Sequence, residues 1–137
     1  MTQNRDESAR VLSQLKRVIR TNYSNPPTHG GAIVAAVLNN PNLRQQWEDE
    51  LSHMRDRIKA MRHELVLRLA ANGAKQDFGF IESQRGMFSY SGLTAEQVAR
   101  LQKEDSIYAL STGRICVAAL NTKNIDRVAK AVARVLA

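Results

Sequence analysis

The 137 residues are 43% hydrophobic, which fits one globular domain with a modest core. The chain carries 20 Lys and Arg against 13 Asp and Glu, a formal charge of +7, but the two signs alternate through the middle of the chain, which argues against nucleic-acid binding. No apolar run reaches membrane-spanning length and the N-terminus has no apolar signal region, so we expect a cytoplasmic protein without a membrane partner.

The first forty residues predict two helices separated by a linker. Apolar side chains repeat at helical spacing over residues 11–19, behind two acidic residues whose charges suit a helix N-terminus, and this helix should end near Arg20. Two consecutive prolines predict a linker or hinge over residues 23–27, because each proline fixes its own φ and disfavours the α region for its predecessor. Residues 32–38 then form a short apolar helix.

A long amphipathic helix is the strongest pattern in the chain, and Gly73 provides a left-handed stop for it. Apolar residues recur every three or four positions along this helix. They are Trp47, Leu51, Met54, Ile58, Met61, Leu65 and Leu69.

Short strands are predicted in two pairs, residues 78–82 with 87–90 and residues 107–111 with 114–120. The motif from Thr94 to Gln97 is a capping box, so a helix should begin there.

A final helix follows the second pair, with apolar residues at 125, 128, 132 and 135 and Asn121 as its expected cap. The fold class is therefore α+β, a small sheet of three to four short strands covered by helices that include the long amphipathic one.

Few residues form a constellation that could carry chemistry. The three histidines are dispersed and Cys116 is the single cysteine, so no metal site is expected, and an apolar run around Cys116 favours a buried, inert thiol. Arg114 begins an apolar strand, where it could grip a carboxylate or simply end a strand at the surface. Arg20 could similarly be no more than a helix-end cation.

A resemblance to a known family decides between the functional and the purely structural role of these two arginines. Three segments carry the resemblance: RTNYSNPPTHG at 20–30, GMFSYSGL at 86–93 and STGRICVA at 111–118. They resemble, in order, motifs of the bacterial aspartate and aromatic-amino-acid aminotransferases of fold type I, class I. The long helix falls between the first two segments, as in that family.

The resemblance implies a role for each matching position. Arg114 would bind the substrate α-carboxylate, and Arg20 would reach across a homodimer to the distal carboxylate in the partner's site. Phe88 would line the substrate pocket. The residues expected at the subunit interface near that site are Tyr23, Ser24 and Asn25.

The same resemblance implies that residues 1–27 are the tail of a large domain with its hinge and that residues 28–137 are the small domain. Members of the family carry the Schiff-base lysine and the other groups that hold pyridoxal phosphate upstream of these motifs. We therefore expect no catalytic residue and no bound cofactor in this chain, and no activity in isolation. The parent would transfer an amino group between aromatic or dicarboxylic amino acids and 2-oxo acids, and the segment that begins at Arg114 looks closer to the aromatic branch of the family.

A different class remains as the alternative. The chain could be a small α+β domain that serves only as a non-enzymatic binding or interaction module, with its arginines on a solvated face.

Overall fold

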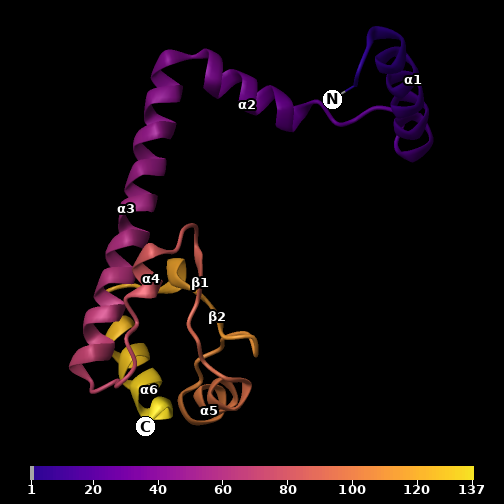
Figure 1. Cartoon of the computed structure of the whole chain (residues 1–137). Helices are drawn as coiled ribbons and strands as arrows, with labels where there is room; N and C mark the ends of the chain where they lie inside the picture. The colour runs from indigo at the N-terminus through magenta and orange to yellow at the C-terminus, as the bar shows by residue number, and fades with distance from the viewer. Residues whose placement is uncertain (1) are drawn as a thin grey trace. The chain divides into compact units, whose positions relative to one another are not determined.

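The computed structural model describes residues 2–137, and the chain divides into two compact units, Met1–Trp47 and Glu48–Ala137 (Figure 1). In the first unit, helix α1 spans Arg5–Asn22 and is capped by Asn4, whose side chain accepts a hydrogen bond from the backbone of Glu7 at 2.9 Å. The predicted helix is confirmed and extends two residues past Arg20. None of its residues is buried, and its apolar side chains are exposed; they are Val11, Leu12, Leu15, Val18 and Ile19.

Two further helices follow the proline-containing segment 23–27. Helix α2 spans His29–Asn39, and helix α3 spans Pro41–Ala71. Asn40 separates them because its side-chain oxygen accepts from the backbone N–H groups of Asn42 and Leu43, at 3.0 and 3.2 Å. Proline suits the first position of a helix, where its missing N–H would have no partner. The long helix therefore begins six residues before the first residue of its predicted apolar stripe.

The end of α3 lies in the second unit and carries the buried stripe that the sequence predicts. Leu65 and Leu69 are each only 2% exposed, and Met61 is also buried. Gly73 ends the helical path with φ +81°, and the N–H of Ala74 returns to the carbonyl of Leu69 at 3.1 Å.

The sheet of the second unit is an antiparallel ribbon of β1 (Phe88–Tyr90) and β2 (Arg114–Cys116). The α+β class is confirmed, but the expected three to four strands are wrong, because residues 2–137 contain two. Residues 107–110 do not form a strand, although Leu110 donates its N–H to the carbonyl of Arg114, the first residue of β2, at 3.1 Å. Beyond Cys116 the chain turns into the 3-10 helix η1, Val117–Ala119, which shortens the predicted strand 114–120.

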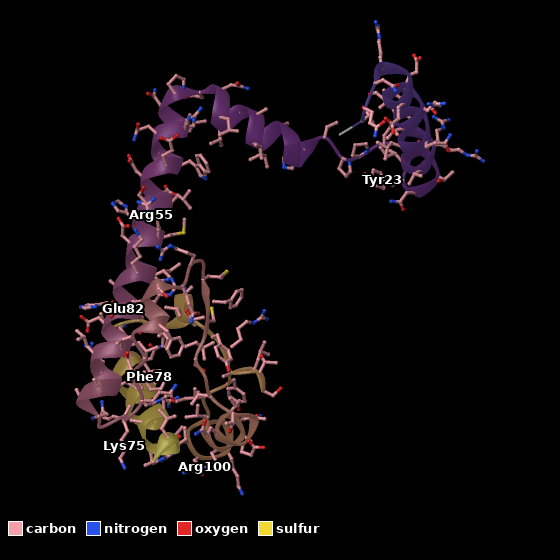
Figure 2. All side chains as sticks on the ribbon, in the orientation of Figure 1. Tyr23, Arg55, Lys75, Phe78, Glu82 and Arg100 are labelled. Carbon is pink, nitrogen blue, oxygen red and sulfur yellow. The ribbon has the colours of Figure 1, made fainter. Side chains whose placement is uncertain are left out.

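The segment predicted as a strand at 78–82 is helical instead. Helix α4 spans Phe80–Ser83, preceded by a turn in which Asp77 accepts from the backbone N–H of Gly79 at 2.8 Å. Phe78 and Ile81, 3% and 1% exposed, are three residues apart and both enter the core. Spacing of three favours a helical turn over a strand, whose side chains alternate. Figure 2 labels Phe78 within this unit.

Helix α5 spans Ala95–Asp105, and its capping box between Thr94 and Gln97 is confirmed. Helix α6 spans Ile125–Leu136 and begins after Asn124, so the expected cap at Asn121 is wrong. The side chain of Asn121 is already used in the preceding turn, where it accepts from the backbone N–H groups of Lys123 and Asn124.

Helices α3 to α6 contribute most of one hydrophobic core, onto which the inner face of the ribbon packs through Ile115. Helices α3 and α6 are joined by Arg68 and Asp126 at 2.6 Å. The opposite, outer face of the ribbon is exposed at Phe88, Tyr90 and Arg114. Within residues 2–137, no helix combines the length and the apolar character needed to cross a membrane.

Candidate functional site

Arg114 and Phe88 meet on the outer face of the ribbon. The register places Tyr90 opposite Arg114 and Phe88 opposite Cys116, so Phe88 and Arg114 are diagonal neighbours on one face. The guanidinium carbon of Arg114 lies 4.9 Å from the centre of the Phe88 ring. This is the range of a cation–π contact, so the two side chains come together on one face of the ribbon.

Two shallow depressions adjoin this pair and are open to solvent. One, of about 340 Å³, is lined by Phe88, Ser89, Tyr90, Thr112 and Arg114. The other, of about 290 Å³, is lined by Phe88, Arg114 and residues from both 108–110 and 115–116. Phe88 and Arg114 therefore form the wall that the two depressions share.

The side chain of Arg114 forms no hydrogen bond or ion pair with any residue from 2 to 137; its contact is the ring of Phe88. A guanidinium presents a planar fork of N–H donors that matches the two oxygens of a carboxylate. An oriented arginine without an internal acid is thus equipped to bind an external carboxylate.

The turn before Arg114 is tightly constrained. Gly113 has φ +78°, and a Cβ atom there would lie 2.7 Å from the backbone oxygen of Leu93. The carbonyl of Gly113 accepts two hydrogen bonds from Ser91, one from the backbone N–H at 2.9 Å and one from the hydroxyl at 2.7 Å. Only glycine fits both the backbone conformation and the close approach. The Thr112-Gly113 turn therefore holds the backbone of Arg114 in a fixed position.

Sequence reasoning missed Arg62, which is 3% exposed beneath the ribbon. Its guanidinium donates to the carbonyls of Gly86 and Phe88, at 2.8 and 3.1 Å, and to the hydroxyl of Ser89 at 3.1 Å. A signal was present, because position 62 lies four residues after Ile58 and three before Leu65, on the apolar stripe of α3.

Gln84 was also missed. Its side-chain amide binds both backbone groups of Tyr90, accepting from the N–H at 2.8 Å and donating to the carbonyl at 3.0 Å. Gln84 thereby occupies an edge of β1 that no strand in the described chain covers.

The residues expected at a subunit interface lie in the first unit, at the end of α1, where Figure 2 labels Tyr23. Arg20 is exposed in the last turn, and its side chain has no partner within residues 2–137. The N–H groups of Tyr23 and Ser24 both return to the carbonyl of Ile19 at 3.2 Å. Ser24 has φ +64°, a left-handed conformation that is uncommon for a residue other than glycine. Asn25 donates its N–H to the carbonyl of Tyr23 at 2.7 Å.

Other chemistry-bearing groups lie apart from Arg114. All six lysines are exposed, and none lines either depression. Across the described residues, no three His, Cys, Asp or Glu side chains group closely enough to hold a metal ion. Cys116 is half-buried rather than buried as expected, because it belongs to the thin ribbon and borders one depression.

Comparisons with known proteins agree with the resemblance seen in the three segments. A family model described as aminotransferase class I and II matches residues 5–132. An aspartate aminotransferase of Pseudomonas aeruginosa is 66% identical over 136 residues, which cover 99% of this chain and 34% of that protein. The aromatic-amino-acid aminotransferase of Escherichia coli is 49% identical over 136 residues, with the same two coverages.

Solved structures agree as well. The aromatic-amino-acid aminotransferase from Burkholderia pseudomallei, covalently bound to pyridoxal phosphate, is 70% identical and matches with a TM-score of 0.93. The match covers 100% of this chain and 34% of that one, so the chain spans about a third of the length of these relatives. Since the family model matches nearly the whole chain and the fold agrees, this chain belongs to the class I and II aminotransferase family.

Proposed function

We propose that this chain is the C-terminal, substrate-carboxylate-binding part of a pyridoxal-phosphate-dependent aminotransferase. The parent would exchange an amino group between aromatic or dicarboxylic amino acids and 2-oxo acids, in the cytoplasm. In this proposal residues 1–27 are the tail of the large domain with its hinge, and residues 28–137 are the small domain. Family membership and the named activities of the relatives support the reaction class.

Arg114 is the residue that binds the substrate α-carboxylate in this proposal. The observation that carries it is the exposed guanidinium on the ring of Phe88 without an acidic partner among residues 2–137. A carboxylate arriving from solvent would gain two parallel charge-assisted hydrogen bonds from a fork that Phe88 and the Gly113 turn already orient. Phe88 would also line the pocket for the substrate side chain.

Arg20 is assigned to the distal carboxylate of a dicarboxylic substrate in the partner subunit of a homodimer. Its exposure and lack of a partner in the described chain support this assignment, as does the nearby hinge. Tyr23, Ser24 and Asn25 would form part of the subunit interface beside that site. The left-handed Ser24 is consistent with a segment held by contacts outside this chain, since such conformations persist where the surroundings determine them.

Arg20→Ala tests the assignment in a longer protein that contains this chain. The variant should lose far more kcat/KM with aspartate than with phenylalanine, because only aspartate presents a second carboxylate. Equal losses with the two substrates would remove Arg20 from the site.

The residues described here do not fit the anchoring of pyridoxal phosphate. A lysine that forms a Schiff base needs an unprotonated amine, which proteins favour by burial or by neighbouring cations, whereas every lysine in this chain is exposed. The cofactor supplies an electron sink when bound. The contribution of this chain is to bind and orient the substrate carboxylates.

A carboxylate titration tests the role of Arg114 directly. The isotope-labelled chain is titrated with 3-phenylpropionate, which offers one carboxylate and an aromatic ring, while the side-chain N–H signals of the arginines are followed by NMR. The Arg114 signal should shift, and Arg114→Lys should bind about tenfold more weakly because lysine lacks the planar fork.

Arg127→Lys is the matched control, since Arg127 is an exposed arginine on α6. This variant should bind like the unmodified chain. Equal binding by the Arg114→Lys variant would contradict the proposed function.

A further inference from the structure

Arg62 is a buried arginine that holds one strand of the ribbon from within. The 3% exposed side chain donates four hydrogen bonds, two to backbone carbonyls and two to the hydroxyl of Ser89. Ser89, 2% exposed, is the inward-facing side chain of β1, between the outward-facing Phe88 and Tyr90. Arg62 therefore acts on the inner side of the strand whose outer side contacts Arg114.

The hydrogen bond from Arg62 to the Phe88 carbonyl lies on the edge of β1 that faces away from β2. Met87 and Ser91 bond across to Val117 and Gly113, so the alternation of an antiparallel pair turns the backbone groups of Phe88 and Tyr90 to the other edge. On that edge Gln84 occupies both groups of Tyr90, and Arg62 occupies the carbonyl of Phe88. A two-stranded ribbon is only marginally stable alone. The hydrogen bonds from these two side chains therefore help to hold the free edge of β1 in position.

Stability of the fold does not by itself account for a charged residue at this position. All the hydrogen bonds of Arg62 are to neutral oxygens, and no carboxylate within residues 2–137 pairs with it. Burial, and next the positive charge of Arg85, lower the pKa of Arg62 from its ordinary value. A buried cation without a counter-charge is unfavourable unless its hydrogen bonds compensate, and an apolar side chain of similar size often serves as well.

We propose that Arg62 is a positioning residue for carboxylate binding: by holding the Phe88 carbonyl and the Ser89 hydroxyl, it fixes the ring against which Arg114 lies. The inference rests on the proposed function for the carboxylate, whereas the positioning itself is a property of this chain alone. Without Arg62, β1 loses its edge contact at Phe88, the ring moves from Arg114, and the guanidinium is no longer oriented before a carboxylate arrives.

The same helix offers a matched control. Arg57 also donates two hydrogen bonds to backbone carbonyls, those of Leu120 and Ala118, each at 2.9 Å. Both carbonyls lie beyond β2 rather than on β1. Arg57→Met therefore removes two hydrogen bonds to backbone carbonyls from the same helix, the same number of backbone bonds that Arg62→Met removes, without touching the backbone of Phe88.

The experiment compares Arg62→Met, Arg62→Lys and Arg57→Met in the whole chain by NMR. In Arg62→Met, nuclear Overhauser effects between the Phe88 ring and the Arg114 side chain should disappear although the protein remains folded, and 3-phenylpropionate should bind about tenfold more weakly. Arg62→Lys should keep part of the nuclear Overhauser effects and part of the affinity for 3-phenylpropionate, because an ammonium can still donate to the same oxygens. Arg57→Met should keep the Phe88–Arg114 contact and the affinity for 3-phenylpropionate, even if its unfolding temperature falls. Retention of the contact in Arg62→Met, or its loss in Arg57→Met, would overturn the inference.

Ser89→Ala covers the case in which Arg62→Met does not fold. This variant removes the acceptor of two of the four hydrogen bonds with little change in volume, so the ring contact should weaken in a folded protein. An unchanged contact would refute the positioning role. The two proposals also separate: an unmodified chain that binds no carboxylate contradicts the proposed function, whereas equal binding by the unmodified chain and Arg62→Met contradicts the role of Arg62.

Discussion

The guanidinium of Arg114 lies over the ring of Phe88, 4.9 Å from its centre, on the exposed face of a two-stranded ribbon. An exposed cation–π contact contributes only about 0.5–1 kcal/mol, so its main consequence is to orient the arginine rather than to stabilise the fold. Substitutions at Phe88 should therefore separate binding from stability.

Phe88→Leu keeps an apolar side chain but removes the aromatic face. We expect the free energy of unfolding to change by about 1 kcal/mol or less, because Phe88 is 45% exposed, while 3-phenylpropionate binds several-fold more weakly. Thermal unfolding and NMR titration measure the two effects. Phe88→Tyr, which keeps the ring, should behave like the unmodified chain in both. A large loss of stability without a loss of binding would show that the ring belongs to the core instead.

Gly113→Ala should be much more destabilising than Gly73→Ala. Both glycines have positive φ, +78° and +81°, so each alanine incurs roughly 1–2 kcal/mol of backbone strain. At Gly113 the added Cβ also meets the backbone oxygen of Leu93, whereas nothing lies within 4 Å at Gly73. The clash should add about 1–3 kcal/mol, read from chemical denaturation. Equal losses at the two sites would mean that the close approach relaxes without cost.

Leu65→Ala should lower the free energy of unfolding by about 2–5 kcal/mol, because Leu65 is 2% exposed and its loss leaves a cavity in the core. Leu67 is on the same helix but 51% exposed, so Leu67→Ala should change stability by no more than about 0.5 kcal/mol. Denaturant unfolding of both variants checks the assignment of the buried face. Similar effects would mean that α3 does not pack through this stripe.

The capping region of α5 should show a local pH dependence. A hydrogen bond from the backbone N–H of Glu96, and next one from the Thr94 hydroxyl, lower the pKa of the Glu96 carboxyl. Since the pKa in the folded state is below that in the unfolded state, the stabilisation is present above the ordinary glutamate pKa and is lost as the pH falls through the folded value.

Thr94→Ala should raise the Glu96 pKa towards its ordinary value, because the hydroxyl donor is gone. Thr94→Ser, which keeps the hydroxyl, should not. An NMR titration of the Glu96 side-chain carbon measures this directly. An unchanged pKa in Thr94→Ala would assign the whole shift to the backbone N–H.

The purified chain should neither form an internal aldimine with pyridoxal phosphate nor catalyse transamination of aspartate, glutamate or tyrosine. A positioned general base contributes about 10²–10⁴-fold in rate, and the exposed lysines offer no such group beside Arg114. A coupled transaminase assay with borohydride trapping and peptide mapping tests this. Turnover that depends on the cofactor, or stoichiometric labelling of one lysine, would contradict the expectation; scattered labelling of several lysines would not.

The sequence alone determined the longer helices and the family. Apolar spacing in α3, the capping box of α5 and the two consecutive prolines act on neighbouring residues, so the chain order alone reveals their effects. Three local segments, each read without knowledge of the fold, were enough to indicate the aminotransferase family.

Strand pairing and the environment of charged side chains were decided by the tertiary structure. Residues 107–111 have the composition of a strand, but a strand needs a ladder of backbone hydrogen bonds, and in the described chain this segment makes a single bond to β2, from the N–H of Leu110 to the carbonyl of Arg114. Arg62 has the appearance of a solvated helix charge until β1 folds over it and supplies carbonyl and hydroxyl oxygens from residues 24 to 27 positions away. Such contacts join distant segments, so periodicity can place Arg62 on the buried stripe of α3 but cannot identify the oxygens that it binds. The contact between Phe88 and Arg114 likewise depends on a register that only the folded ribbon defines.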